Sequence, residues 1–287
     1  MGRSIIGLLG LGTIAYISAC LALLVGQSRL IFLPRPDLTT TPAELGLAHQ
    51  DVWISMDEGY LHGWWLPASD PRAKTVLFLH GNGGNVGSHL QQAWFLSQVG
   101  WSVLLIDYRG YGLSSGPFPN ETRVYEDAAA VWDYLTQTQN QAPENIIIFG
   151  HSIGGAIAIE LAHRHPQAAG LIVQGTFTSM AAMVDHIGYS RIFPRWLLTQ
   201  RFNSQQKLST LQMPILLIHG SEDETIPATM SQDLYAIAPQ PKQLWLVPGA
   251  SHNNVPEVAG PHYIQTLQRW LSSIHPTEVA VVPADDR

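Results

Sequence analysis

Residues 146–155 read I-I-I-F-G-H-S-I-G-G, a short apolar run that leads into a serine between glycines. The apolar run is typical of a buried strand, and residues 153–162 have the periodicity of a helix. The segment from Gly150 to Gly154 fits G-x-S-x-G, in which a sharp strand-to-helix turn exposes the serine and the glycines avoid collisions. Ser152 would then lie at a helix N-terminus, where unpaired N–H groups favour negative charge. This stretch predicts a nucleophile at Ser152. The alternative is a tight turn that the glycines make possible and that has no catalytic role.

Further short apolar runs alternate with helix-length segments along the chain. Six runs are predicted to be strands buried on both faces: 75–79, 101–106, 145–149, 170–173, 215–218 and 243–247. A predicted hairpin of residues 51–56 and 60–67 precedes them. Four intervening or following segments have 3.6-residue periodicity: 124–135, 153–162, 230–236 and 262–274. The order predicts an α/β fold with a mostly parallel eight-stranded sheet, an antiparallel start and flanking helices.

A serine nucleophile needs a base and an acid, and the expected chain order is serine, carboxylate, histidine. Three carboxylates, Glu222, Asp223 and Glu224, compete in the loop after strand 215–218. His252 lies in the loop after strand 243–247. Because ligands bind at the carboxyl ends of parallel strands, these loops and Ser152 are expected to meet at one edge of the sheet.

A glycine-rich loop, H-G-N-G-G-N at residues 80–85, follows the strand 75–79. Its backbone N–H groups could hold an oxyanion, together with the N–H of Ile153, the residue after the nucleophile. A phosphate-binding loop is not indicated, because the segment has neither G-K-[ST] nor the dinucleotide pattern G-x-G-x-x-G.

The interval 176–213 interrupts the alternation, because it contains no evident strand and many apolar and aromatic residues. A loop of this length between two strands is usually functional, so we interpret it as a small helical cap over the site. The alternative is an ordinary pair of surface helices.

The N-terminus is the part of the chain that most resembles a membrane segment. Residues 5–25 contain no charge and no proline, and as a helix they would span about 30 Å, the thickness of a bilayer core. A cleaved signal peptide would have a shorter apolar region, and no A-x-A-like site is evident. Residues 17–20, I-S-A-C, resemble a lipoprotein processing site, but the apolar run continues past Cys20. We therefore expect an uncleaved single-pass anchor, and the flanking arginines do not decide its orientation.

These features divide the chain into four parts. We expect a transmembrane anchor at 1–28, a proline-interrupted linker at 29–50, a catalytic domain at 51–275 with the cap at 176–213, and a disordered tail at 276–287.

Composition excludes several classes of function. Hydrophobic residues make up 46% of the 287 residues and charged residues 13%, which argues against general disorder. The formal net charge is −7 and no basic run is present, so nucleic-acid binding is not expected. A single cysteine excludes an intramolecular disulfide and metal sites built on several thiolates. The histidines at 62, 163 and 165 show no ligand pattern, and no metal or cofactor is expected.

Together the motifs resemble the α/β-hydrolase superfamily, and within it a membrane-anchored subgroup, the Bem46-like and ABHD13- or ABHD17-like proteins. The resemblance covers residues 51 to about 274 and rests on five motifs in family order: L-H-G-N-G-G-N at 79–85, D-Y-R-G-Y-G at 107–112, G-H-S-I-G-G at 150–155, H-G-x-x-D-x-x-I-P at 219–227, and the His252 loop. It implies that the acid is Asp223. It also implies that Asn82 and Ile153 form the oxyanion hole, and that 107–112 is a supporting loop.

The expected function is therefore a serine hydrolase for carboxylic esters or thioesters, acting through Ser152, His252 and Asp223. An anchor and an apolar cap would suit a lipid-like or acylated substrate. Two alternatives remain: a serine aminopeptidase-like peptidase, and a non-catalytic membrane-tethered interaction protein on the same fold. The sequence does not indicate the oligomeric state.

Overall fold

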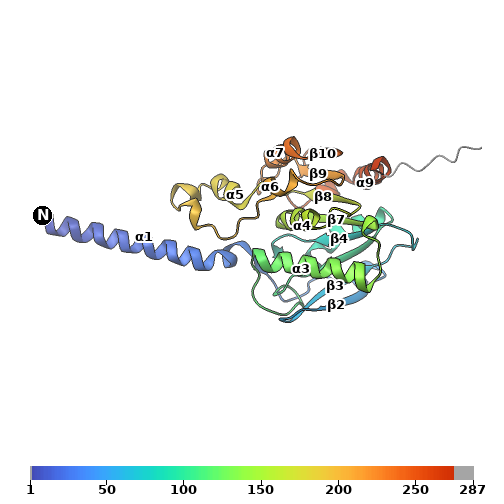
Figure 1. Cartoon of the computed structure of the whole chain (residues 1–287), viewed down its shortest axis with the longest axis horizontal. Helices are drawn as coiled ribbons and strands as arrows, with labels where there is room; N and C mark the ends of the chain where they lie inside the picture. Colours follow the sequence, from blue (N-terminus) through green and yellow to red (C-terminus); the bar gives the residue numbers. More distant parts are fainter. Residues whose placement is uncertain (1, 275–287) are drawn as a thin grey trace, which may run out of the picture.

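The computed structural model describes residues 2–274, so the tail expected at 276–287 lies outside the described part. An eight-stranded sheet with the order β10-β9-β8-β7-β4-β6-β3-β2 forms its centre (Figure 1). The strands are β2 (Gln50–Ser55), β3 (Tyr60–Leu66), β4 (Thr75–Leu79), β6 (Ser102–Ile106), β7 (Ile146–His151), β8 (Gly170–Gln174), β9 (Ile215–Gly220) and β10 (Lys242–Val247). Strands β4 and β6 to β10 are parallel, whereas β2 and β3 pair antiparallel at one edge. The predicted fold class is confirmed.

The central strands are buried on both faces, which explains their continuous apolar sequences. In β4, Leu77 packs into the core under one set of helices and its neighbour Phe78 into the core under the other set. The flanking helices are α2 (Leu90–Gln98), α3 (Glu121–Asp133), α4 (Ile153–Arg164), α7 (Ala228–Ile237), α8 (Val255–Ala259) and α9 (Pro261–Ile274). Helices α3, α4 and α7 cover one face, and α2, α8 and α9 cover the other. Short helical turns complete the connections: η1 (Pro42–Leu45), η2 (Val86–His89), η3 (Tyr134–Thr138) and η4 (Pro143–Asn145).

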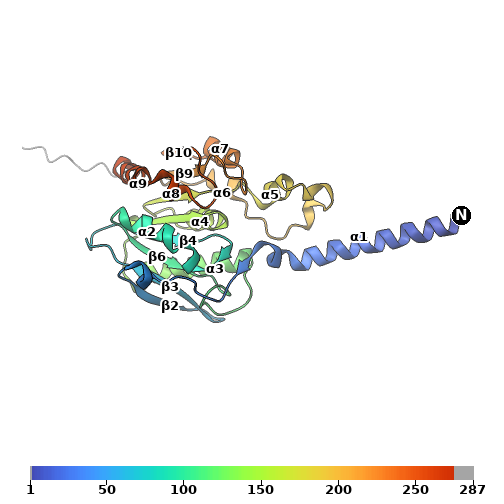
Figure 2. The ribbon, with the colours of Figure 1, turned by 180° about the vertical axis from the view of Figure 1, so that it is seen from behind.

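The interval 176–213 folds into short helical pieces without a strand, and we refer to it as the cap. Its elements are α5 (Met180–His186), η5 (Tyr189–Arg191), η6 (Arg195–Leu197) and α6 (Ser204–Leu208). The cap projects from the domain on the same side as α1 (Figures 1 and 2).

The helix α1 (Gly2–Ile31) extends away from the domain as a single straight element (Figures 1 and 2). Its segment Leu8–Ile31 is long and apolar enough to cross a membrane, a property that signal sequences share. Helix α1 continues three residues beyond the anchor boundary expected from the sequence. The strand β1 (Leu33–Pro34) follows it and pairs with β5 (Gly83–Gly84) of the glycine-rich loop. The helix therefore joins the domain directly beside that loop.

Candidate active site

Ser152 occupies a sharp turn between β7 and α4. Its backbone has φ 57° and ψ −124°, a conformation that a non-glycine residue adopts only where the surrounding structure enforces it. The turn is held by hydrogen bonds from the Ser152 N–H to the carbonyl of Gln174, 2.9 Å, and from the Thr176 hydroxyl to the carbonyl of Ser152, 2.8 Å. A Cβ on Gly150 would lie 2.2 Å from the carbonyl oxygen of Gly154. The close approach of these backbones explains the glycines of the motif.

The structure brings Ser152, His252 and Asp223 into one chain of hydrogen bonds. The Nε2 atom of His252 lies 3.0 Å from the Oγ atom of Ser152. Its Nδ1 atom lies 2.6 Å from Oδ2 of Asp223. The two residues reach the serine from the loops after β9 and β10, which are parallel neighbours in the sheet. In this arrangement the imidazole can accept the hydroxyl proton while the carboxylate fixes its tautomer.

The surroundings of Asp223 distinguish it from its acidic neighbours. Its Oδ1 atom accepts hydrogen bonds from the N–H groups of Thr225, 2.9 Å, and Ile226, 2.8 Å. Its Oδ2 atom lies 3.0 Å from Nε2 of His219. Burial alone would raise the pKa of Asp223, but the hydrogen bonds from His219, from His252 and from the Ile226 N–H together hold that pKa well below its ordinary value. The carboxylate therefore stays ionised at neutral pH.

Glu222 and Glu224, the other two candidates for the acid, are both exposed to solvent. Residues 222–224 alternate in direction along the loop, so that only the middle carboxylate turns inward. The position of the three residues after the strand leaves the acid open, and the family resemblance implies Asp223; the geometry places Asp223 beside His252.

Asn82 and Ile153, the two residues expected to form an oxyanion hole, both line the cavity at Ser152. Within residues 2–274, the backbone N–H of neither residue donates a hydrogen bond, so both donors are available to a ligand. The side chain of Asn82 points elsewhere, because its Nδ2 donates to the carbonyl of Ile31, 2.9 Å. The loop is thereby fastened to the C-terminal end of α1.

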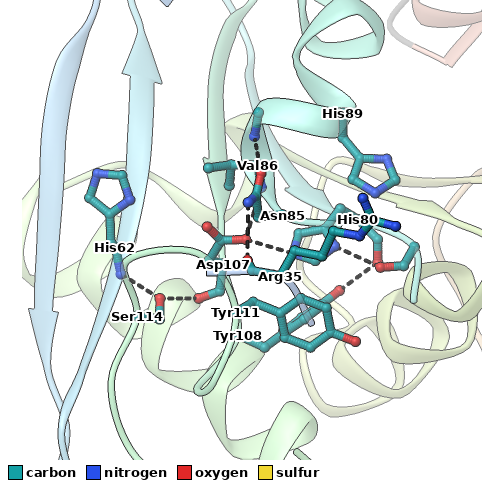
Figure 3. A network of polar contacts seen from close by, with 12 residues as sticks. Arg35, His62, His80, Asn85, Val86, His89, Asp107, Tyr108, Tyr111 and Ser114 are labelled. Atoms are coloured by element: carbon teal, nitrogen blue, oxygen red, sulfur yellow. Dashed lines mark hydrogen bonds and ion pairs between the residues drawn. The ribbon is translucent and has the colours of Figure 1, made fainter. Parts of the chain in front are cut away.

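The loop 107–112 packs against the glycine-rich loop through polar contacts (Figure 3). None of its residues lines the cavity. The carboxylate of Asp107 is fully buried and accepts a hydrogen bond from the N–H of Val86, 2.8 Å. The hydroxyl of Tyr108 donates to the carbonyl of His80, 3.0 Å, and the hydroxyl of Tyr111 to the carbonyl of Asn82, 2.8 Å. These hydrogen bonds hold the backbone around Asn82 in place, and they thereby fix the position of the Asn82 N–H group that is available to a ligand.

Histidines form a row beside the serine, in which His80 and His151 are buried and His89 and His252 are partly exposed. His80 and His89 stack with ring centroids 5.0 Å apart, and the ring of His151 lies 6.0 Å from that of His89 and 5.1 Å from that of His252. His151 also interacts through Nε2 with the carbonyl of His252, 3.1 Å, and so positions the loop that carries the base. Sequence reasoning missed His89, because it lies at a helix start without any motif around it.

Burial, reinforced by the neighbouring His252, lowers the pKa of His151 to about 3. We therefore expect acid to destabilise the fold between pH 6.5 and pH 4. An unfolded histidine takes up a proton in this range whereas folded His151 does not, so stability falls by about 1.4 kcal/mol per pH unit for this group. Thermal unfolding in detergent between pH 7 and 4.5 should show a shallower pH dependence for His151→Gln. The exposed His262 on α9 provides the control, since His262→Gln should leave the slope as it is. Equal slopes for wild type and His151→Gln would contradict this account.

A large cavity of about 1110 Å³ opens at Ser152. Its walls are mostly apolar and come from the glycine-rich loop, the cap and the last turns of α1. The contribution of α1 was not predicted from the sequence. The contributions of α1 are Leu23, Gln27, Leu30 and Ile31. Among the described residues, no cluster of histidine, cysteine and carboxylate side chains could hold a metal ion.

Comparisons with known proteins identify the superfamily of the chain. Residues 70–206 match the model of the family described as serine aminopeptidase, S33. The chain is 34% identical over 258 residues to the uncharacterized protein Rv2307c of Mycobacterium tuberculosis, with 89% of each chain covered. It is 31% identical to the alpha/beta hydrolase domain-containing protein WAV2 of Arabidopsis thaliana, over 77% of this chain and 78% of that one.

Solved structures share the fold. The esterase Pf2001 of Pyrococcus furiosus superimposes with a TM-score of 0.67 at 22% identity, over 85% of this chain and 98% of that chain. An alpha-beta hydrolase from Vibrio vulnificus has a TM-score of 0.64 at 26% identity, over 78% of this chain and 82% of that one.

Proposed function

Because the chain belongs to the α/β-hydrolase superfamily, we propose that it is a serine hydrolase in which Ser152, His252 and Asp223 form the catalytic triad. One observation carries the proposal: the continuous hydrogen-bonded chain from the Ser152 hydroxyl through the His252 imidazole to the ionised Asp223 carboxylate. This chain begins at a serine held in a strained turn beside two available N–H donors.

The reaction that this geometry favours is acyl transfer to the serine and then to water. His252 takes the Ser152 proton through Nε2 while Oγ bonds to the substrate carbonyl carbon. The N–H groups of Asn82 and Ile153 hold the resulting oxyanion. His252 then protonates the departing alcohol or thiol, and in the second half it activates a water that releases the acid and restores the serine. Asp223 orients the imidazole and stabilises its charged form throughout.

The cavity favours a carboxylic ester or thioester with an apolar acyl chain. Its lining contains leucine, isoleucine, methionine and phenylalanine side chains from α1 and the cap. An aminopeptidase would need an anion to bind the substrate amine, and no aspartate or glutamate lines the cavity among the described residues. An ester or thioester is therefore the better candidate, and an aminopeptidase-like activity the weaker one. We further propose that α1 anchors the protein in a membrane, which suits a lipid-like or acylated substrate.

Labelling with a fluorophosphonate probe tests the proposed nucleophile. Wild type should be labelled and Ser152→Ala should not, with kcat for p-nitrophenyl acetate lowered about a million-fold, as for loss of the serine in other triads. Ser88 provides a matched control, because its hydroxyl lines the same cavity. Ser88→Ala should be labelled like wild type. Equal labelling of wild type and Ser152→Ala would show that another residue is the nucleophile. Labelling of neither would favour a non-catalytic protein on this fold.

A further inference from the structure

The helix α1 contacts the cap along its C-terminal half, well beyond its junction with the domain (Figures 1 and 2). The hydroxyl of Tyr16 donates to the carbonyl of Ile192, 3.0 Å. Eleven residues later, the Gln27 amide donates to the carbonyl of Leu197, 2.6 Å, and accepts from the N–H of Thr199, 2.9 Å. Gln27 is only 7% exposed. The two contacts lie about 16 Å apart along the helix, so the cap is held at two levels of α1.

The part of α1 that projects beyond the cap is too short to cross a bilayer. Residues 2–15 precede Tyr16, and at 1.5 Å per residue they measure about 21 Å. The hydrocarbon core of a bilayer is about 30 Å thick, and a tilted helix covers less of it. At least about 9 Å of the core must therefore be crossed by the portion of α1 that lies beside the cap. Elements that lie in the interface enter it to a similar depth, about 5–10 Å.

The segment 187–196, here termed the cap tip, has the composition expected at such a depth. Four of its large side chains are exposed: Ile187, Tyr189, Ile192 and Trp196, the last with 80% of its surface accessible. Two arginines accompany them: Arg191, which is exposed, and Arg195, whose guanidinium forms an ion pair with Asp185, 2.6 Å. Tryptophan, tyrosine and arginine are typical of the boundary between lipid tails and headgroups, where the rings bury their apolar surface and the cations meet lipid phosphates.

The cavity at Ser152 lies between the same two elements. Leu23 and Leu30 of α1 form part of one wall, and Met183 and Phe193 of the cap form part of another. A molecule that reaches the serine along these walls passes between α1 and the cap, and Leu23 lies about 10 Å along α1 from Tyr16, close to the boundary of the lipid core.

We propose that the cap tip is inserted into the leaflet that α1 crosses, and that substrate acyl chains enter the cavity sideways from the lipid, between α1 and the cap. The proposal rests on the proposed function, both the serine hydrolase and the anchor. It identifies the substrate class as an ester or thioester whose acyl chain resides in the bilayer, and it makes α1 part of the binding site.

The tryptophans of the chain provide a direct test. The full chain is reconstituted in vesicles of phosphatidylcholine and phosphatidylglycerol with acyl chains brominated near the headgroup, and tryptophan quenching is measured. Helix α1 contains no tryptophan, so quenching reports on the domain alone. Trp196→Phe should remove most of the quenching. Trp53 is the matched control, since it is 52% exposed on the edge strand β2, and Trp53→Phe should leave the quenching intact.

An activity measurement completes the test with residues outside the cavity lining. In the double variant Ile192→Ser and Trp196→Ser, hydrolysis of p-nitrophenyl palmitate carried in the vesicles should fall at least about tenfold, because two apolar side chains no longer hold the tip in lipid. Hydrolysis of soluble p-nitrophenyl acetate should be unchanged.

The outcomes separate the proposals. Suppose that the wild type reacts with the fluorophosphonate probe and floats with vesicles. If Trp196→Phe then leaves the tryptophan quenching unchanged, lateral entry alone is overturned. Equal losses on both esters in the double variant also overturn it. Failure to float overturns the anchor and lateral entry together, and failure to react with the probe overturns the hydrolase on which both depend.

Discussion

Replacing Asp223 by asparagine is expected to lower kcat about ten thousand-fold, with a much smaller effect on KM. The neutral amide can still contact His252 at the 2.6 Å position of Oδ2, but it can present a donor there and so stabilise the wrong imidazole tautomer. It also removes the negative charge that stabilises the imidazolium formed when Ser152 loses its proton. Steady-state kinetics on p-nitrophenyl acetate, with unfolding temperatures to show that the variant is folded, measure the effect.

The neighbouring carboxylates serve as controls within the same loop. Glu222→Gln and Glu224→Gln should each change kcat by less than about threefold, because both side chains are exposed and changes at such surface positions are small. A loss for either variant comparable to that of Asp223→Asn would show that the acid has been wrongly assigned.

Substituting Gly154 by alanine is expected to have the second large effect, on the fold. A Cβ at this position would lie 2.1 Å from the carbonyl oxygen of Leu79 and 2.4 Å from that of His80. Both are backbone atoms, at the end of β4 and the start of the glycine-rich loop, and neither can move aside cheaply. We expect a destabilisation of at least about 4 kcal/mol, or roughly 10 °C in unfolding temperature, accompanied by loss of probe labelling.

Gly26 provides the comparison for this substitution. It is also helical, but a Cβ there would meet nothing within 4 Å. Gly26→Ala should therefore keep the wild-type unfolding temperature or raise it, since alanine is the better helix former. If Gly154→Ala unfolds at the wild-type temperature, the close packing of the elbow against β4 is not as described.

The parts of the fold that could be predicted are those in which local sequence and global structure agree. The strand β7, the turn at Ser152 and the helix α4 each have their own local signal, and the order of strands then places the His252 loop at the same edge. The choice of Asp223 among the three acidic residues 222–224 came from the resemblance at 219–227 and not from the local sequence, because which carboxylate points inward depends on hydrogen bonds to backbone N–H groups.

The role of α1 in the cavity could not be predicted, for a different reason. The uncharged sequence from 5 to 25 predicts a helix of membrane length, but such a sequence gives no information about which side is in contact with protein. Among the α1 side chains that the structure describes, Gln27 is the polar one that is buried against the cap. It lies just beyond residues 5–25, near Arg29, where it would be taken for a boundary residue. The pairing of β1 with β5 could not be predicted either, since strands of two residues have no periodicity.

The fastening of α1 to distant parts of the chain also has a consequence for biosynthesis. The first helix leaves the ribosome long before its partner Leu197, which is 170 residues further along, and before the loop at Asn82 that holds its last turn. During translation the helix is therefore available to the insertion machinery while its polar contacts are still missing. Under the proposed anchoring by α1, the cavity can be closed only when the rest of the chain reaches the membrane surface, and maturation of the site would then be coupled to completion of synthesis there.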